Sequence, residues 1–143
     1  MFGFLSRGAR EHVAMIDRHL RPFLRQHRFR LKAVRGAGHE WTAVYVSREC
    51  QLAIYDSARN GEVNCMIALP SAPNGPRAVG REHGWHHIFG FLNEGLSFDE
   101  LLALVPENAV SREEQMRKVA NALEGHFPMM FERISAPSAD VEA

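Results

Sequence analysis

The stretch from Trp41 to Leu69 constrains the fold of this chain more than any other part of it. Apolar residues alternate with polar ones through the segments WTAVYVS, QLAIYDS and VNCMIAL, and a period of two is typical of β-strands. Before the last segment lies Asn60-Gly61, a dipeptide that accepts the positive φ angles of a tight hairpin turn. The pattern predicts consecutive antiparallel β-hairpins, with strands over about 41–47, 51–57 and 62–69.

The residues before these strands predict a helix and a first strand. Apolar side chains recur at helical spacing from about Arg10 to His27. Pro22 lies inside this pattern and lacks the backbone N–H that a helix interior needs, so we expect the helix to kink or restart there. An extended stretch beginning at Phe29 predicts a strand that ends at about Arg35.

After the hairpins, residues 70–80 contain three prolines and two glycines, which predicts a loop. The apolar run from Trp85 to Leu92 is compatible with either a short helix or a final strand.

Two capping boxes mark C-terminal helices. Ser97 and Ser111 are each followed three residues later by Glu, the pattern that satisfies free backbone N–H groups at a helix start. We expect one helix to end by Pro106 and the last one to end at Pro128. Residues 136–143 offer no core-forming side chain and are expected to be a disordered tail.

Together these elements predict an α+β fold: an antiparallel meander sheet of about four strands, with an N-terminal helix and two C-terminal helices packed on it. A chain of 143 residues with 45% hydrophobic residues can bury one core without metal or disulfide support. We therefore expect a single domain over residues 1–135.

Charge is distributed unevenly along the chain. Residues 1–35 carry nine Arg or Lys against two acids, residues 36–91 four against five, and residues 92–143 four against ten. A basic leading segment is compatible with nucleic acid or with an acidic protein partner. We favour a third interpretation, in which terminal helices of opposite charge lie side by side on one face of the sheet. Aromatic residues are not interleaved with the basic ones, so we do not expect nucleic-acid binding.

The sequence also bears on cellular location. The N-terminus has no charged leader or apolar run of signal-peptide length, and no window reaches the length of a membrane span. These features predict a cytoplasmic protein without a membrane partner. A single bridge between Cys50 and Cys65 is possible, but we favour buried free thiols.

No motif predicts catalysis or a bound cofactor. His83 and His87 have the i, i+4 spacing of helical zinc ligands, with Glu82 and His86 nearby, but Gly84 lies between them. Serine and cysteine residues lack any nucleophile signature. We therefore expect no catalytic residue, no metal and no cofactor.

Several charged residues are candidates for binding a partner. They lie on the first helix, around the Asn60-Gly61 turn, and in or after the proline-rich loop: Arg18, Arg21, Arg25, Asp56, Arg59, Glu62, Arg77 and Arg81. The arginines would meet an acidic surface of another protein, although the turn residues are also explained as a solvated hairpin tip. An alternative ligand site would use Trp85, His86 and His87.

The order of features resembles small bacterial α+β proteins, among them immunity proteins of polymorphic toxin systems. The likeness spans about residues 10–105 and rests on the end of the first helix and on the strands VYVS and LAIYDS. The matching residues at the helix end are Leu20, Pro22, Leu24 and Phe29. Arg28 departs from the pattern, because those proteins usually have Gly at this position. The resemblance implies a non-catalytic binder that neutralises a cognate toxin.

Three other functions stay open from the sequence. One is a small enzyme or ligand-binding domain with its site near Trp85. Another is a nucleic-acid binder that uses the N-terminal arginines, and the third is self-assembly through the apolar residues Phe2, Phe4 and Leu5.

Overall fold

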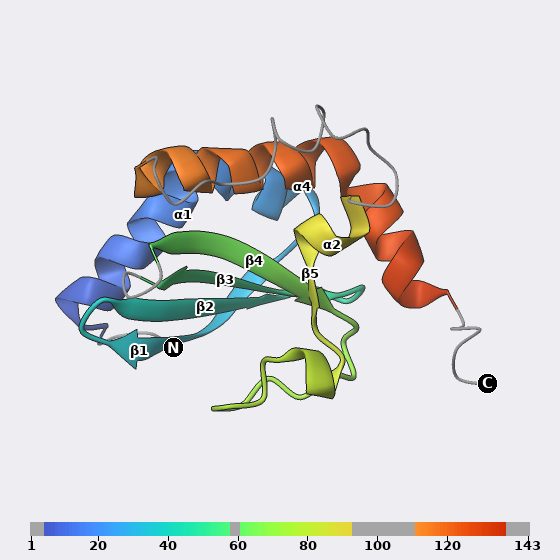
Figure 1. Ribbon diagram of the computed structural model, residues 1–143, viewed down its shortest axis with the longest axis horizontal. Coiled ribbons are helices and arrows are strands. Elements are labelled where there is room, and N and C mark those ends of the chain that lie inside the picture. Colours follow the sequence, from blue (N-terminus) through green and yellow to red (C-terminus); the bar gives the residue numbers. More distant parts are fainter. Residues whose placement is uncertain (1–4, 58–60, 93–110, 137–143) are drawn as a thin grey trace.

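The computed structural model describes residues 5–57, 61–92 and 111–136 (Figure 1). The first half of the chain forms α1 (Arg7–Gln26), β1 (Arg30–Ala37), β2 (Glu40–Val46), β3 (Gln51–Ser57) and β4 (Glu62–Ala68). The second half forms the short 3₁₀ helix η1 (Arg81–His83), β5 (His86–His87), α2 (Ile88–Leu92) and α4 (Arg112–Ser135).

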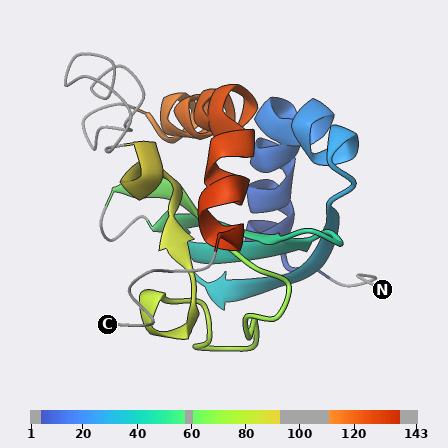
Figure 2. The same ribbon diagram turned by 90° about the vertical axis from the view of Figure 1, so that its right-hand side faces the viewer.

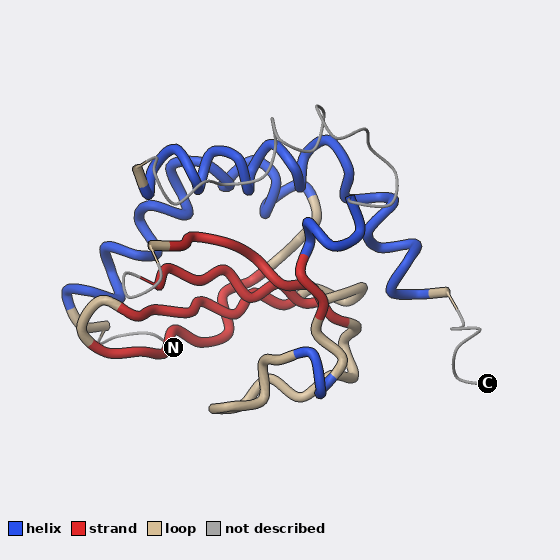
Figure 3. Tube along the Cα trace, viewed as in Figure 1, coloured by secondary structure: helices blue, strands red, loops and turns tan. Residues whose placement is uncertain are grey.

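The strands form one antiparallel sheet in the order β1-β2-β3-β4-β5, which follows the chain (Figure 3). Strands β2, β3 and β4 begin and end within one residue of the ranges predicted from the alternating pattern. Gly61, in the predicted turn, has the positive φ of 65° that favours glycine. The sheet has one strand more than predicted, because two residues of the segment after Trp85 pair with β4. The α+β fold is confirmed.

Helices α1 and α4 pack side by side on one face of the sheet (Figure 2). Each places its apolar side on the strands, and the main core lies between the two layers. Its largest fully buried side chains include Ile16, Leu20, Leu52, Ile54, Ile67, Met116 and Leu123. Burying one such side chain contributes about 1.5–3 kcal/mol, so this layer supplies most of the stability and fixes where α1 and α4 lie.

The opposite face of the sheet is covered by the chain between β4 and β5, which includes η1, rather than by an α-helix (Figure 1). A smaller apolar cluster lies beneath it, made of Val44, Ala53, Met66, Ala68 and the fully buried Trp85. Trp85 Nε1 donates to the carbonyl of Pro73 at 2.9 Å. The predicted proline-rich loop is therefore attached to the sheet rather than free in solvent.

Gln51, at the start of β3, holds the same loop in place. Its amide nitrogen donates to the carbonyls of Leu69 at 3.0 Å and Ala72 at 2.8 Å, and its amide oxygen accepts from Asn74 at 2.6 Å. We call these four residues the Gln51 network. The side chain of Gln51 is 1% exposed, and its nitrogen and its oxygen both have partners.

The prediction that the last helix ends at Pro128 was wrong, because α4 continues to Ser135. Of the two alternatives expected at Pro22, a kink or a restart, the restart does not occur, since α1 runs through this residue. Each proline lies on the exposed side of its helix. The backbone carbonyl that loses its hydrogen bond there can be solvated by water, so the cost of the missing N–H is reduced. Apolar residues beyond each proline, Phe23 and Met130 among them, are buried in the core and favour continuation.

The ends of the other predicted elements can also be compared. The segment from Trp85 to Leu92 contains both a strand and a helix, β5 followed directly by α2. Ser111 caps α4 as predicted, since its Oγ accepts from the backbone N–H of Glu114 at 3.1 Å. The helix predicted over 97–106 lies outside the described residues. None of the described helices combines the length and the apolar composition that a membrane crossing needs.

Candidate functional site

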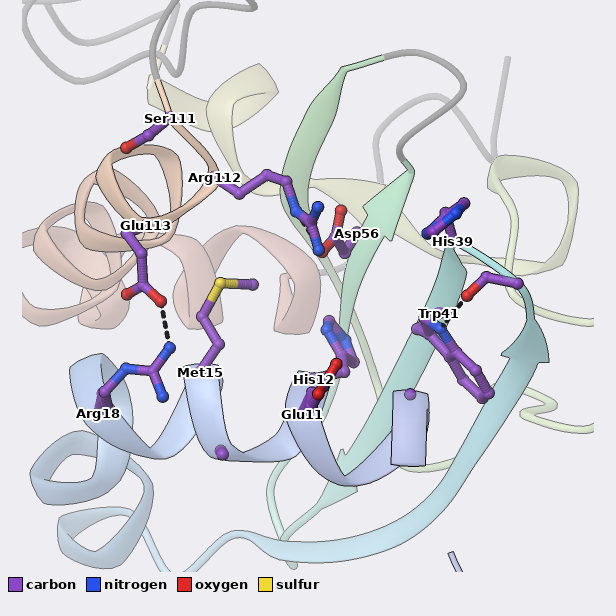
Figure 4. Close-up of a pocket in the computed structure, with 13 residues that line it drawn as sticks. Glu11, His12, Met15, Arg18, His39, Trp41, Asp56, Ser111, Arg112 and Glu113 are labelled. Atoms are coloured by element: carbon purple, nitrogen blue, oxygen red, sulfur yellow. Dashed lines mark hydrogen bonds and ion pairs between the residues drawn. The ribbon is translucent and has the colours of Figure 1, made fainter. Parts of the chain in front are cut away.

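A cavity of about 540 Å³ lies between α1, the start of β2, the end of β3 and the beginning of α4 (Figure 4). We call it the α1–α4 cavity. Its lining includes His12 and Arg18 from α1, Asp56 from β3, and Arg112 from α4. Volumes of this size are typical of small-ligand sites, and the lining combines apolar walls with charged groups.

His12 lies on the inward side of α1, where the helical spacing would otherwise place an apolar residue. Its side chain is 3% exposed, and its Nε2 lies 2.9 Å from the backbone oxygen of Ile54. A carbonyl oxygen can only accept, so Nε2 carries the proton. Burial lowers the pKa of His12, while the hydrogen bond to Ile54 and the charge of Asp56 oppose this shift and Arg112 adds to it.

Because the imidazole is neutral, Nδ1 of His12 carries a lone pair. This atom is buried and has no hydrogen-bond partner among the described residues. The ring extends from α1 toward Asp56 in the close-up (Figure 4). His12 is a residue of the lining and therefore keeps a buried, unused acceptor beside the cavity.

Asp56 lies at the end of β3 on the side of the sheet that faces the helices. Its side chain is 3% exposed, and Oδ2 accepts from Arg112 Nε at 3.0 Å and Nη2 at 2.9 Å. The other oxygen, Oδ1, is buried and has no partner in the part of the chain that the structure describes. Asp56 thus contributes a second unused acceptor.

Trp41 and Gly8 form one wall of the cavity. A Cβ atom at Gly8 would lie 2.6 Å from the Trp41 ring, so only glycine allows this close approach between α1 and β2. The indole Nε1 of Trp41 donates to the carbonyl of Gly38 at 2.9 Å. The Trp41 ring is thus held by a backbone carbonyl, and the unpaired buried atoms among the described residues of the lining belong to His12 and Asp56.

At the rim, Glu113 of α4 connects the two helices. It contacts Arg18 through an ion pair, and His19 Nε2 lies 2.6 Å from its Oε1. Hydrogen bonds from Arg18 and His19 lower the pKa of Glu113. Glu11, also at the rim, pairs with Arg7 at 3.1 Å on the exposed surface.

These contacts bear on the predicted charge segregation. Helices α1 and α4 lie side by side, as the favoured interpretation predicted, but they are not of opposite charge. Helix α4 carries four acidic and four basic residues, so all of the acidic excess of residues 92–143 falls outside the described ranges.

The structure brings two of the predicted partner-binding residues into this cavity, Arg18 and Asp56. Arg21 and Arg25 are exposed on α1 one and two turns further along. Glu62, on β4, accepts from Tyr55 at 3.3 Å and from Asn64 at 3.0 Å.

The remaining predicted arginines do not join them. Arg77 and Arg81 lie in the segment between β4 and β5 and are exposed, and neither lines the cavity. Arg59 lies outside the described residues.

The alternative ligand site is dispersed. Trp85 is fully buried in the apolar cluster on the loop-covered face, whereas His86 and His87 are exposed on β5. The His87 ring lies near Tyr55, and the His86 ring near Phe91. Among the described residues, no group of three or more His, Cys, Asp or Glu side chains is placed to hold a metal ion.

The two thiols are not part of the site. Cys50 and Cys65 are free and buried, as favoured from the sequence. Burial raises the pKa of Cys50 to about 12 and raises that of Cys65 as well. Neither thiol is a ready nucleophile at neutral pH.

Sequence reasoning missed His12 and Arg112 altogether. The signal that could have found the site is a break in each apolar pattern. His12 lies within the buried stripe of α1, and Asp56 follows Leu52 and Ile54 on the inward side of β3. A polar residue on a core-facing position must find a partner or serve a site.

No family model, curated protein or solved structure matches this chain.

Proposed function

We propose that this protein is a non-catalytic binding protein that recognises another protein by taking one of its side chains into the α1–α4 cavity. The observation that carries the proposal is the pair of unused acceptors, His12 Nδ1 and Asp56 Oδ1, each on a side chain that is 97% buried. Leaving a buried polar atom unpaired costs about 1–3 kcal/mol. A group that arrives from outside would recover that cost on binding.

The charge of α1 supports a protein partner. Arg18, Arg21 and Arg25 follow a three- and four-residue spacing, which places them along one side of the helix. The stripe begins at the rim of the cavity, because Arg18 is part of the lining. Arg21 and Arg25 would meet acidic groups of the partner around the inserted side chain and would steer its approach.

The chemistry of the lining supports binding over turnover. Ser111, the hydroxyl residue at the cavity, uses its Oγ as the cap of α4. An attacking group would need a neighbouring base to activate it, and that oxygen is already engaged at the helix end.

More specifically, we propose that the protein is an immunity protein that neutralises a cognate bacterial toxin, as the resemblance implies. This proposal predicts that a toxin gene lies beside the gene for this chain. Co-expression of the two should restore growth of a host that the toxin alone kills.

A direct test is affinity capture from the native host with two tryptophan variants. Ala14 lines the cavity and is exposed at its mouth, so Ala14→Trp should block entry. Asn121→Trp adds the same side chain to an exposed position of α4 that is not part of the lining. We expect the wild type and Asn121→Trp to retain one stoichiometric partner and Ala14→Trp to lose it. A partner that all three retain equally, or no stoichiometric partner for the wild type, would contradict the proposal.

A second candidate function is that of a small acid–base enzyme. The observation that favours it is the neutral imidazole of His12 facing a cavity, which is the state that a general base requires. A ligand bound by an enzyme would be converted on incubation, whereas a binding protein would return it unchanged. Mass spectrometry of the ligand before and after incubation separates the two.

A further inference from the structure

The unused atoms of the α1–α4 cavity define what can bind there. His12 Nε2 already donates to Ile54, so Nδ1 of the neutral ring can only accept. Asp56 Oδ2 is occupied by Arg112, and Oδ1 can likewise only accept. Both open positions therefore call for hydrogen-bond donors, and an incoming carboxylate or phosphate would satisfy neither.

The charge of the lining selects among donors. The acidic residues of the lining are Glu11, Asp56 and Glu113, and the basic ones are Arg18 and Arg112. Each of these acids has a basic partner, because Arg7 outside the lining pairs with Glu11, Arg18 with Glu113 and Arg112 with Asp56. A positively charged donor is favoured over an anion because the open acceptor of Asp56 belongs to a carboxylate, and hydrogen bonds between charged groups are the stronger ones.

The number of open acceptors selects among cations. A lysine ammonium group has three donors and no acceptor, whereas an arginine guanidinium group has five donors in a fixed plane. Two buried acceptors are open among the described residues of the lining, His12 Nδ1 and Asp56 Oδ1. An ammonium group can use both and keep its third N–H toward solvent, while a guanidinium group would bury donors without partners.

We infer that the side chain that enters the α1–α4 cavity is a lysine of the partner protein, with its ammonium group bound to His12 Nδ1 and Asp56 Oδ1. This inference rests on the proposed function and names the chemistry of the partner at that site. The sequence predicts that the partner is acidic where it meets the arginines of α1. We keep that prediction for the surface around the cavity, but the group that enters the cavity itself is a cation.

The test uses small probes that copy single side chains: n-butylammonium for lysine, n-butylguanidinium for arginine and n-butanoate for an acidic residue. They are titrated into the full chain, and long-range ¹H–¹⁵N spectra follow both ring nitrogens of His12. We expect n-butylammonium to shift the Nδ1 resonance saturably and to bind at least about tenfold more tightly than n-butanoate, because only the cation brings donors. The Nε2 resonance should change less, because that nitrogen keeps its bond to Ile54.

Two variants check that the signal comes from this cavity. Asp56→Asn removes the charge at the open acceptor and should weaken n-butylammonium about tenfold or more. Glu124→Gln makes the same change at an exposed residue of α4 that does not line the cavity, and should leave binding unchanged. Amide spectra of both variants establish that they remain folded, and the comparison among probes on the wild type does not depend on either variant.

The possible outcomes separate this inference from the proposed function. Tighter binding of n-butanoate or n-butylguanidinium at His12 would overturn the lysine while keeping the cavity as a binding site. No saturable shift from any probe would overturn the lysine and leave only water for the open acceptors. Retention of the captured partner by Ala14→Trp would overturn the proposed function whatever the probes show. Acetylating the lysines of a captured partner should abolish its recapture, and recapture after acetylation would contradict a lysine.

Discussion

The two ends of β3 hold buried polar side chains that differ in one respect. Gln51 at the start has a partner for both atoms of its amide group. Asp56 at the end and His12 above it each keep one acceptor without a partner among the described residues. Both regions are almost fully buried, so burial does not distinguish them. A polar group whose atoms are all paired stabilises a fold, whereas an unpaired one costs stability and is retained where function requires it.

The largest expected effect comes from breaking the Gln51 network. Gln51→Leu keeps most of the volume but removes the donors to Leu69 and Ala72 and the acceptor for Asn74. We expect the free energy of unfolding to fall by about 3 kcal/mol, because several partners lose their hydrogen bonds together. Urea unfolding measures this, with Gln26→Leu at the exposed end of α1 as the matched control. Equal losses in the two variants would show that the network does not hold the loop.

The next effect comes from removing Arg112, the partner of Asp56 in the described part of the chain. Arg112→Ala leaves a buried carboxylate without its ion pair, and we expect a loss of about 2 kcal/mol. Arg117→Ala, on the same helix, breaks a pair with the more exposed Glu114 and should cost clearly less, because solvent screens that pair. Urea unfolding of both variants tests the difference. A smaller loss for Arg112→Ala than for Arg117→Ala would contradict the buried pair.

A third effect depends on pH and involves His12 alone. Its pKa is lowered in the folded state from the ordinary value of 6.5, so the unfolded chain binds the proton first as the pH falls. The contribution of His12 to stability is complete above pH 6.5 and is lost as the pH falls through the lowered folded pKa. The loss cannot exceed about 1.4 kcal/mol per pH unit for one proton.

His12→Leu should therefore unfold with a shallower dependence on pH in this window than the wild type. Urea unfolding at several pH values measures the difference between the two slopes. Identical slopes would mean that His12 does not titrate differently on folding.

The smallest expected effect is that of His12→Leu on stability at about pH 7.5, where we expect a change within about 1 kcal/mol. The substitution removes one hydrogen bond and also one unpaired buried atom, and these contributions oppose each other. Partner capture should nevertheless be lost. As a reference on the same helix, Leu20→Ala removes a fully buried side chain and should cost about 2–5 kcal/mol. A loss of that size for His12→Leu would assign His12 to the core instead of the site.

Much of the fold could be predicted from the sequence because its signals are local. Alternating apolar residues place β2, β3 and β4 to within one residue, and Ser111 with Glu114 marks the start of α4. The end predicted at Pro128 and the restart considered at Pro22 were wrong because the rule for helix interiors ignores tertiary packing. Pro22 and Pro128 lie on exposed sides, while the buried residues beyond them keep each helix on the sheet.

The site could be predicted only in part because its members are far apart in the chain. Arg18 and Asp56 stood out as charged residues, but their convergence with His12 and Arg112 depends on how α1 and α4 lie over β3. His12 on an apolar helix stripe reads as one more core residue. Its unused nitrogen becomes visible only when the contacts of every neighbour are known.

The most direct test of the account is a crystal structure of the protein grown with n-butylammonium. We expect the ammonium nitrogen in the α1–α4 cavity, about 3 Å from His12 Nδ1 and from Asp56 Oδ1. Asp56 Oδ2 should remain bound to Arg112, and the Gln51 network should be unchanged. A direct hydrogen bond between His12 and Asp56 that closes the cavity, with the cation elsewhere or absent, would contradict it.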